Sequence, residues 1–190
     1  MWSRHSPLGG YGARMRVIAG TARGRTLVAP SGHTVRPTAD RVRQATFNAL
    51  DSRDAIVGAR VLDLFAGTGA MGIEALSRGA LHCTFVEKDR IALAVIRTNI
   101  EALGLESQAT VIGSDVSRFV RTPVRNIDLA LVDPPYTFDG WDEVLVALRG
   151  VALVVVETGS IFAAKGWEIV RQQRYGGTVV TLTTPEESAA

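Results

Sequence analysis

A glycine-rich stretch near residue 70 constrains the fold of this chain most strongly. The apolar run at residues 61–64 is followed by Gly67, Gly69 and Gly72, after which a helical pattern begins. Glycine is needed where the backbone bends sharply and approaches a ligand closely, because a Cβ would collide there. The stretch therefore predicts a strand, a tight turn and a helix, with the G-x-G-x-x-G spacing of a nucleotide-binding loop.

Two acidic residues narrow the kind of ligand. Asp63 lies on the strand before the glycines, where a carboxylate favours a cationic amine over a pyrophosphate. Glu87 ends the next apolar run, at the spacing where an acid binds ribose hydroxyls. Together they indicate a nucleoside with a positively charged amino-acid tail, which describes S-adenosylmethionine. The structural alternatives are that Asp63 caps the loop and that Glu87 is a solvated strand end.

The sequence Asp133-Pro134-Pro135-Tyr136 follows the apolar run at residues 127–132. That run is typical of a buried parallel strand, and the two prolines stiffen the chain just beyond it. A carboxylate, free carbonyls and an aromatic ring in one small space suit a planar base that carries an exocyclic amino group. Asp-Pro is also ordinary turn chemistry, which is the alternative interpretation.

Strand and helix patterns alternate from residue 61 onward, which predicts an α/β fold with a mostly parallel sheet and helices on both faces. Strands are expected near 61–65, 82–87, 109–113, 127–132 and 151–156, and helices near 39–50, 70–78, 89–103, 115–121 and 141–148. Residues 167–174 and 178–182 predict an antiparallel hairpin that closes the sheet, and residues 15–35 a separate β-hairpin. Thr38 is the expected N-cap of the first helix.

These motifs, in this order, resemble a class I S-adenosylmethionine-dependent methyltransferase. The amino-terminal part resembles the RsmD family more narrowly, over about residues 15–183. This narrower resemblance rests on Met15-Arg-Val-Ile-Ala-Gly20, Gly24-Arg25, Arg36-Pro37-Thr38-x-Asp40-Arg41-Val42-Arg43, Phe47-Asn48-x-Leu50 and Arg174-Tyr175-Gly176. One departure is Gln44, where the family usually has an acid. The resemblance implies a Rossmann-like, seven-stranded methyltransferase fold and methylation of a guanine N2 in 16S rRNA.

The resemblance also implies roles for individual residues. The residues expected to bind the cofactor are Asp63, Phe65, Gly67, Gly69, Glu87, Asp115 and Val116. Asp115 would bind the adenine amino group, and its competing role is that of a helix N-cap. The residues expected to act on the base are Asp133, Pro134, Pro135 and Tyr136. The candidates for RNA backbone contacts are Arg23, Arg25, Arg36, Arg41 and Arg43, although Arg36 and Thr38 could instead close over the cofactor.

Charge is distributed unevenly along the chain. Residues 1–53 contain nine arginines, no lysine and two aspartates, a net charge of +7, although the whole chain carries only +2. A basic segment on a mildly acidic body is expected of an enzyme that binds nucleic acid. Arginine-rich genome composition would explain arginine in place of lysine, but not its concentration in one segment. The predicted organisation is therefore a disordered extension (1–14), a basic RNA-binding hairpin and helix (15–53) and a methyltransferase domain (54–190).

The remaining expectations concern cellular context and rival functions. No long apolar run, signal peptide or metal-binding cluster is visible, and Cys83 is the only cysteine, so we expect a cytoplasmic monomer without a metal. The expected substrate is 16S rRNA within an assembled or partly assembled small ribosomal subunit. The rivals are a DNA adenine-N6 methyltransferase, a nicotinamide dehydrogenase, and a non-catalytic RNA-binding module with the same fold.

Overall fold

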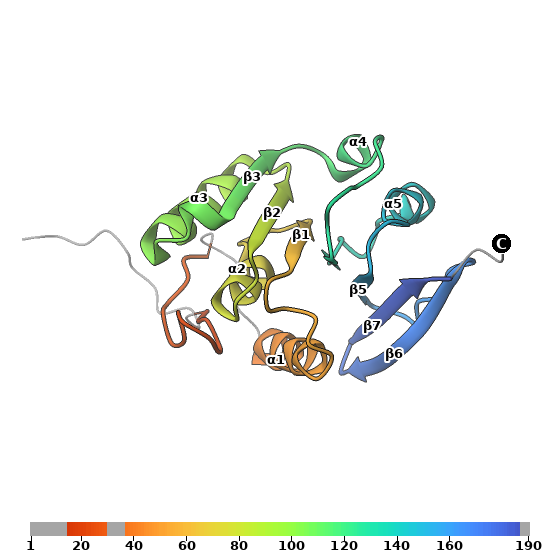
Figure 1. The fold of residues 1–190 in the computed structure, drawn as a ribbon, viewed down its shortest axis with the longest axis horizontal. Coiled ribbons are helices and arrows are strands. Elements are labelled where there is room, and N and C mark those ends of the chain that lie inside the picture. Colours follow the sequence, from red (N-terminus) through yellow and green to blue (C-terminus); the bar gives the residue numbers. More distant parts are fainter. Residues whose placement is uncertain (1–14, 30–36, 187–190) are drawn as a thin grey trace, which may run out of the picture.

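The computed structural model of this protein describes residues 15–29 and 37–186 of the 190-residue chain. In these residues the chain forms one sheet with helices packed on both of its faces (Figure 1). The expectations for residues 1–14, for residues 30–35 of the predicted 15–35 hairpin and for Arg36 fall outside the described residues.

The described strands form a seven-stranded sheet in the order β3-β2-β1-β4-β5-β7-β6. Strands β1 to β5 pair in parallel, whereas β7 pairs antiparallel with both β5 and β6. The strands are β1 (Arg60–Leu64), β2 (His82–Glu87), β3 (Ala109–Gly113), β4 (Leu129–Val132), β5 (Leu153–Thr158), β6 (Trp167–Tyr175) and β7 (Thr178–Pro185). The predicted fold class, a mostly parallel sheet closed by an antiparallel carboxyl-terminal hairpin, is confirmed.

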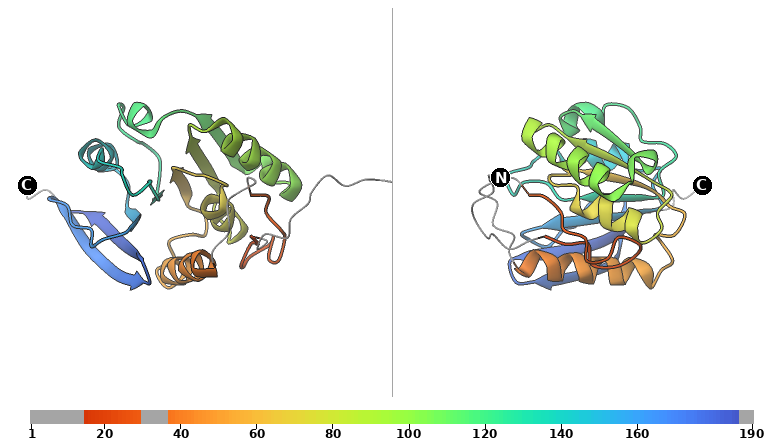
Figure 2. Two further views of the ribbon diagram at one scale, coloured as in Figure 1. Left: turned by 180° about the vertical axis from the view of Figure 1, so that it is seen from behind. Right: turned by 90° about the vertical axis from the view of Figure 1, so that its left-hand side faces the viewer.

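Helices cover the two faces of the sheet as separate layers (Figure 2). On one face lie α1 (Pro37–Asp51), α2 (Ala70–Ser77) and α3 (Arg90–Leu103), which share a buried cluster with that side of the strands. On the other face lie the shorter α4 (Val116–Phe119) and α5 (Trp141–Ala147). A single 3₁₀ turn, η1 (Glu106–Gln108), leads into β3. Cys83 is buried on β2, as expected of an inert thiol.

Helix α1 begins at Pro37, two residues before its predicted start, so Thr38 lies in its first turn rather than at its N-cap. Proline is favoured at the first helical position because its fixed φ is already helical and its missing N–H would have no partner there. Among the strands, β4 starts at Leu129 rather than 127, and β5 is displaced by two residues from the predicted range.

The segment at residues 15–29 folds back on itself through a single bridge between Arg16 and Thr26. Val17 and Leu27 on either side of this bridge are buried in the cluster formed by α1, α2 and α3. The segment therefore shares its core with the sheet. The division of the chain at residue 53 stays a prediction.

Polar side chains of α2 and α3 hold this segment in place. Glu74 accepts hydrogen bonds from the amides of Ile18 at 2.8 Å and Ala19 at 3.0 Å. The amide of Asn99 donates to the carbonyl of Val28 at 3.0 Å, and its oxygen accepts the Val28 N–H at 2.7 Å. The amino-terminal segment is thus fixed to the helices that flank the glycine loop.

Candidate active site

The carboxyl ends of β1 to β5 meet at one edge of the sheet, and this edge collects most of the predicted site residues. Asp63 is buried on β1, where its carboxylate accepts the Gly72 N–H at 2.9 Å. The pKa of Asp63 is raised to about 8, mainly by burial and also by the charges of Asp133 and Glu87, although the Gly72 hydrogen bond acts in the opposite direction. An ammonium group beside Asp63 would reverse this shift, so the position favours a cationic ligand.

The turn after β1 has unusual backbone geometry. Phe65, Gly67 and Gly69 all adopt left-handed conformations, with φ of 61°, 54° and 77°. Such a conformation is strained for phenylalanine and recurs at ligand-binding turns. Gly72 has a different role, since an added Cβ would lie 2.3 Å from the Phe85 ring on β2. The first two glycines shape the loop, and the third allows α2 to pack closely against the sheet.

Glu87, at the end of β2, connects the loop to its neighbouring strand. One carboxylate oxygen accepts the Gly67 N–H at 2.9 Å, and the other accepts the amides of Lys88 at 2.8 Å and Asp89 at 2.9 Å. A carboxylate has about four acceptor positions, so one remains for a ligand hydroxyl. Glu87 is therefore an organised acceptor rather than a freely solvated strand end.

Asp115 has the capping role that the sequence left open. It is the N-cap of α4, and its side chain accepts the Ser117 N–H at 2.9 Å. Its other oxygen lies 2.9 Å from the Lys88 ammonium, and this hydrogen bond is the main cause of the lowered pKa of Asp115. The next residue, Val116, is buried beneath it. Asp115 is exposed, so both roles are compatible.

The Asp133–Tyr136 corner lies just beyond β4, next to the glycine loop. Asp133 is exposed at the sheet edge, yet desolvation by the protein around its carboxyl raises its pKa to about 6. The carbonyl of Pro135 accepts the Phe138 N–H at 2.9 Å, which closes the turn. Pro134 is buried, whereas Tyr136 is 77% exposed. The tyrosine ring therefore offers an open face on which a base could stack.

Two features of this site were not predicted from the sequence. The first is an aromatic row that supports the corner: the ring centroids of Phe65 and Phe138 lie 5.0 Å apart, those of Phe138 and Trp141 5.4 Å apart, and those of Trp141 and Phe162 5.2 Å apart. The second is Glu157, which lies near the end of β5 as Glu87 does on β2. Glu157 could have been identified by the same sequence pattern as Glu87, an acidic residue at the end of an apolar strand.

The predicted RNA-binding arginines differ in their surroundings. Arg23 and Arg41 are exposed. Arg25 is also exposed, but its guanidinium donates to the Ala102 carbonyl near the end of α3 at 2.6 Å. Arg43 is only 5% exposed; it pairs with Asp40 at 3.1 Å and also donates to the carbonyl of Arg16. Arg43 is therefore structural and is withdrawn from the set of candidate RNA contacts.

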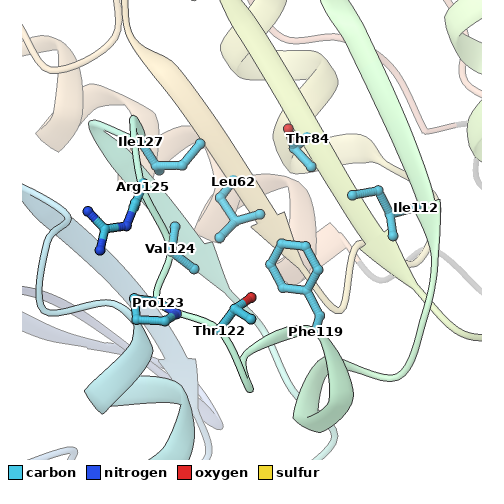
Figure 3. A pocket seen from close by; sticks show the side chains of 9 residues that line it. All are labelled: Leu62, Thr84, Ile112, Phe119, Thr122, Pro123, Val124, Arg125 and Ile127. Atoms are coloured by element: carbon cyan, nitrogen blue, oxygen red, sulfur yellow. The ribbon is translucent and has the colours of Figure 1, made fainter.

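Two surface hollows lie apart from these carboxylates. One, of about 280 Å³, is on the α4 face of the sheet, where Leu62, Thr84 and Ile112 face Phe119 and the loop before β4 (Figure 3). The other, of about 520 Å³, lies between α5 and the loop after β5. Neither is lined by a predicted site residue, so both are separate from the candidate active site. No group of three or more metal-binding side chains occurs among the described residues.

Across the sheet, the carboxylates occupy successive strands in the order Asp115, Glu87, Asp63 and Asp133. Neighbouring strands are about 4.8 Å apart, so this row is long enough for a nucleoside with an amino-acid tail. The polar groups of the row also fit, because Asp115, Glu87 and Asp63 in turn offer acceptors for an amino group, a hydroxyl and an ammonium. The residues present therefore fit S-adenosylmethionine.

The family model described as Conserved hypothetical protein 95 matches residues 15–184. This chain belongs to that family. The resemblance to the RsmD family, based on the amino-terminal motifs, is thereby confirmed. In the described residues, no helix is long and apolar enough to cross a membrane.

Individual relatives agree with this membership. The ribosomal RNA small subunit methyltransferase D of Escherichia coli K12 is 34% identical over 183 residues, which cover 89% of each chain. A Bacillus subtilis protein, named provisionally as an rRNA methyltransferase, is 38% identical over 88% of this chain and 91% of its own. A solved Escherichia coli structure, named provisionally as a methyltransferase, superposes with a TM-score of 0.79 at 33% identity, covering 92% of this chain and 99% of its own.

Proposed function

We propose that this protein is an S-adenosylmethionine-dependent rRNA methyltransferase that modifies the exocyclic N2 of a guanine in 16S rRNA of the small ribosomal subunit. The observation that carries the proposal is the row of carboxylates that ends at Asp133, beside the exposed Tyr136. The name of the Escherichia coli relative supports the substrate class. We place the reaction in the cytoplasm, where the substrate is assembled.

In this proposal, three carboxylates of the row bind different parts of the cofactor. Asp115 and the amide of Val116 would bind the adenine, the remaining acceptor position of Glu87 a ribose hydroxyl, and Asp63 the ammonium of the cofactor. The turn formed by Phe65, Gly67 and Gly69 would lie against its amino-acid part, since the two glycines have left-handed backbone and no side chain to obstruct a ligand. S-adenosylmethionine supplies an electrophilic methyl group on a sulfonium sulfur.

Asp133 and the carbonyl of Pro134 act on the guanine. They accept the two N2–H groups of the base, which directs the nitrogen lone pair toward the methyl group. Because the pKa of Asp133 is raised to about 6, its carboxylate is a better proton acceptor than an ordinary aspartate. As the N–C bond forms, the methyl C–S bond would break with its electron pair staying on sulfur, and N2 would then pass one proton to Asp133. Alignment and the fixed electrostatics of the site provide most of the rate enhancement.

Tyr136 holds the flipped base by stacking, which is worth about 1–3 kcal/mol per base. Extruding a paired base costs a few kcal/mol, so the two terms are of similar size. An unpaired target nucleotide is therefore favoured. The buried Pro134, and the turn closed by the Phe138 N–H on the Pro135 carbonyl, hold the backbone between Asp133 and Tyr136.

The deciding experiment offers labelled S-adenosylmethionine to the purified protein with three substrates. These are small subunits from cells lacking the gene, protein-free small-subunit RNA, and duplex DNA. Nucleoside mass spectrometry should find the label in N2-methylguanosine. Label only in N6-methyladenine of DNA would replace this proposal with the DNA methyltransferase, and no methyl transfer to any substrate would favour the non-catalytic module.

The same three substrates test how the target is presented. Among the described candidates for RNA backbone contacts only Arg23, Arg25 and Arg41 are exposed, and phosphate contacts position RNA without reading its sequence. We therefore expect assembled or partly assembled subunits to be methylated at least about tenfold faster than protein-free RNA. A tenfold difference corresponds to about 1.4 kcal/mol of additional binding free energy when the target nucleotide is held by the subunit. Equal initial rates on the two substrates would refute this prediction.

A further prediction concerns the amino-terminal arginines. Replacing both Arg23 and Arg41 by alanine should weaken RNA binding and flatten its salt dependence, by about 0.7–0.9 in slope for each phosphate that is no longer neutralised. Binding titrations over a range of salt concentrations measure this slope. Arg121→Ala, an exposed arginine after α4 on the other face of the sheet, is the matched control and should leave the slope unchanged.

A further inference from the structure

Strand β5 brings a second carboxyl group next to Asp133. Val132 of β4 and Val156 of β5 are register partners; Asp133 follows Val132 directly beyond the end of β4, and Glu157 follows Val156 within β5. Parallel neighbours are about 4.8 Å apart, and register partners direct their side chains to the same face. The two carboxyl groups also act on each other electrostatically. Glu157 is thus the neighbour of Asp133 on the side away from the cofactor strands β1 and β2.

The base-stacking tyrosine lies against the same strand end. A Cβ added to Gly159 would lie 3.1 Å from a ring carbon of Tyr136, so the ring packs directly on the backbone just after β5. Glu157 precedes this contact by two residues and is half-buried. A base stacked on Tyr136 would therefore lie over the ends of β4 and β5, within reach of both carboxyl groups.

The charges around Glu157 favour its protonated form. Burial and, to a smaller extent, the charge of Asp133 together raise the pKa of Glu157 to about 8, whereas burial raises the pKa of Asp133 to about 6. Near neutral pH the pair therefore holds one proton, which we place on Glu157.

Charged groups on the neighbouring elements complete the surroundings of this pair. Asp63 on β1 and Glu87 on β2 lie on the other side of Asp133 from Glu157. From α1, Asp40 and Arg43 pair with each other and Arg41 is exposed. From β6, the Arg174 guanidinium donates to the Gly159 carbonyl at 3.5 Å. Among the described residues, the effects acting on Glu157 are burial and Asp133.

We propose that protonated Glu157 recognises the guanine: its O–H donates to O6 and its carbonyl oxygen accepts N1–H, while Asp133 accepts N2–H. This inference rests on the proposed function and deepens it. The Watson–Crick edge of guanine carries one acceptor, O6, and two donors, N1–H and N2–H. Two carboxyl groups that share one proton offer the complementary set, one O–H donor and two acceptor oxygens. Adenine has no amino group at position 2, so it would leave Asp133 without its partner.

The proton on Glu157 gives the proposal a specific chemical test. Glutamine is a permanent neutral analogue of the protonated side chain, because its NH₂ donates and its carbonyl accepts in the same places. Ionised glutamate cannot donate to O6 and would place a negative charge against it. Glu157→Gln should therefore preserve recognition and remove its dependence on pH.

The experiment measures kcat/KM for N2-methylguanosine formation in small subunits, below and above pH 8, the region where Glu157 is expected to ionise. The proteins compared are the wild type, Glu157→Gln, Glu157→Ala, and Glu168→Gln as a control at an exposed position on β6. Below pH 8, Glu157→Gln should stay within about threefold of the wild type, whereas Glu157→Ala should fall about 10- to 100-fold because two hydrogen bonds to the base are absent. Above pH 8, the wild type and the control should decline together while Glu157→Gln does not.

Three results would overturn the inference. These are a Glu157→Gln variant as impaired as Glu157→Ala, a Glu157→Ala variant as active as the wild type, and a parallel decline of the wild type and Glu157→Gln above pH 8. Since Glu157→Gln is expected to be active, poor folding of the alanine variant does not prevent the test. Failure of the proposed function is distinguishable, because the wild type itself would then form no N2-methylguanosine at any pH.

Discussion

Replacing Asp133 with alanine should abolish methyl transfer while leaving cofactor binding almost unchanged. The substitution removes both the acceptor that orients the guanine amine and the group that takes its proton. General-base groups contribute about 10²- to 10⁴-fold to rate, so we expect a loss in kcat of at least about 10³-fold. Single-turnover methylation of small subunits measures this loss.

Cofactor affinity in this variant follows from the electrostatics of the sheet edge. The charge of Asp133 raises the pKa of Asp63, so its removal should lower that pKa and leave Asp63 more fully ionised. An ionised Asp63 binds an ammonium group better. The affinity for S-adenosylhomocysteine, measured by calorimetry, should therefore be maintained or increase slightly.

Asp139→Ala is the matched control for this substitution, because it removes an exposed carboxylate from the same corner of the chain. It should keep both activity and affinity. If Asp133→Ala instead lost turnover and cofactor affinity in parallel, Asp133 would mainly build the cofactor pocket, and the proposed proton transfer would have no acceptor.

The parts of the site that could be predicted from sequence are those fixed by local patterns. An apolar run that ends in an acid or in glycine defines a parallel strand and its carboxyl end. Since all such ends meet at one edge, Asp63, Glu87 and Asp133 could be placed together without a structure. The Gly72 backbone and the Asp115 cap follow from equally local rules.

The features that were missed depend on contacts between distant parts of the chain. From sequence, Arg43 is as good a candidate for an RNA contact as its neighbours. In the structure its guanidinium instead lies beside the carboxylate of Glu74, 31 positions away, and donates to the Arg16 carbonyl, so that it is buried. The raised pKa of Glu157 comes from its burial and from the charge of Asp133, which lies just beyond the neighbouring strand β4. Sequence spacing alone carries no information about either pairing.

Replacing Glu74 with alanine should cause the largest loss of stability among the substitutions considered. Glu74 is 1% exposed, and its carboxylate accepts the amides of Ile18 and Ala19 and the Arg78 guanidinium at 2.8 Å. Arg43 lies 3.9 Å from the same carboxylate, and burial lowers the pKa of Arg43. Removing one partner of a buried ion pair costs about 3–5 kcal/mol, because the remaining charge is left without compensation.

Urea unfolding of Glu74→Ala should therefore show a free energy of unfolding lower by about 3–5 kcal/mol. Glu101→Ala, an exposed position on α3, is the control and should change stability by less than about 0.5 kcal/mol. Trypsin should also cleave after Arg23 and Arg25 more rapidly in the Glu74 variant, because the amides of Ile18 and Ala19 then have no acceptor. Equal unfolding curves for the two variants would show that the buried carboxylate does not fix this segment.

The same network links RNA binding to the cofactor loop, so Glu74→Ala should affect function as well as stability. The segment that carries Arg23 is bound to α2, which begins directly after Gly69. On its other side, Asn99 donates to the carbonyls of both Val28 and Thr68, the latter within the glycine loop. Loosening the segment should therefore weaken both RNA binding and S-adenosylhomocysteine binding in the folded variant. A loss of RNA binding alone would show that the segment and the loop behave as independent parts.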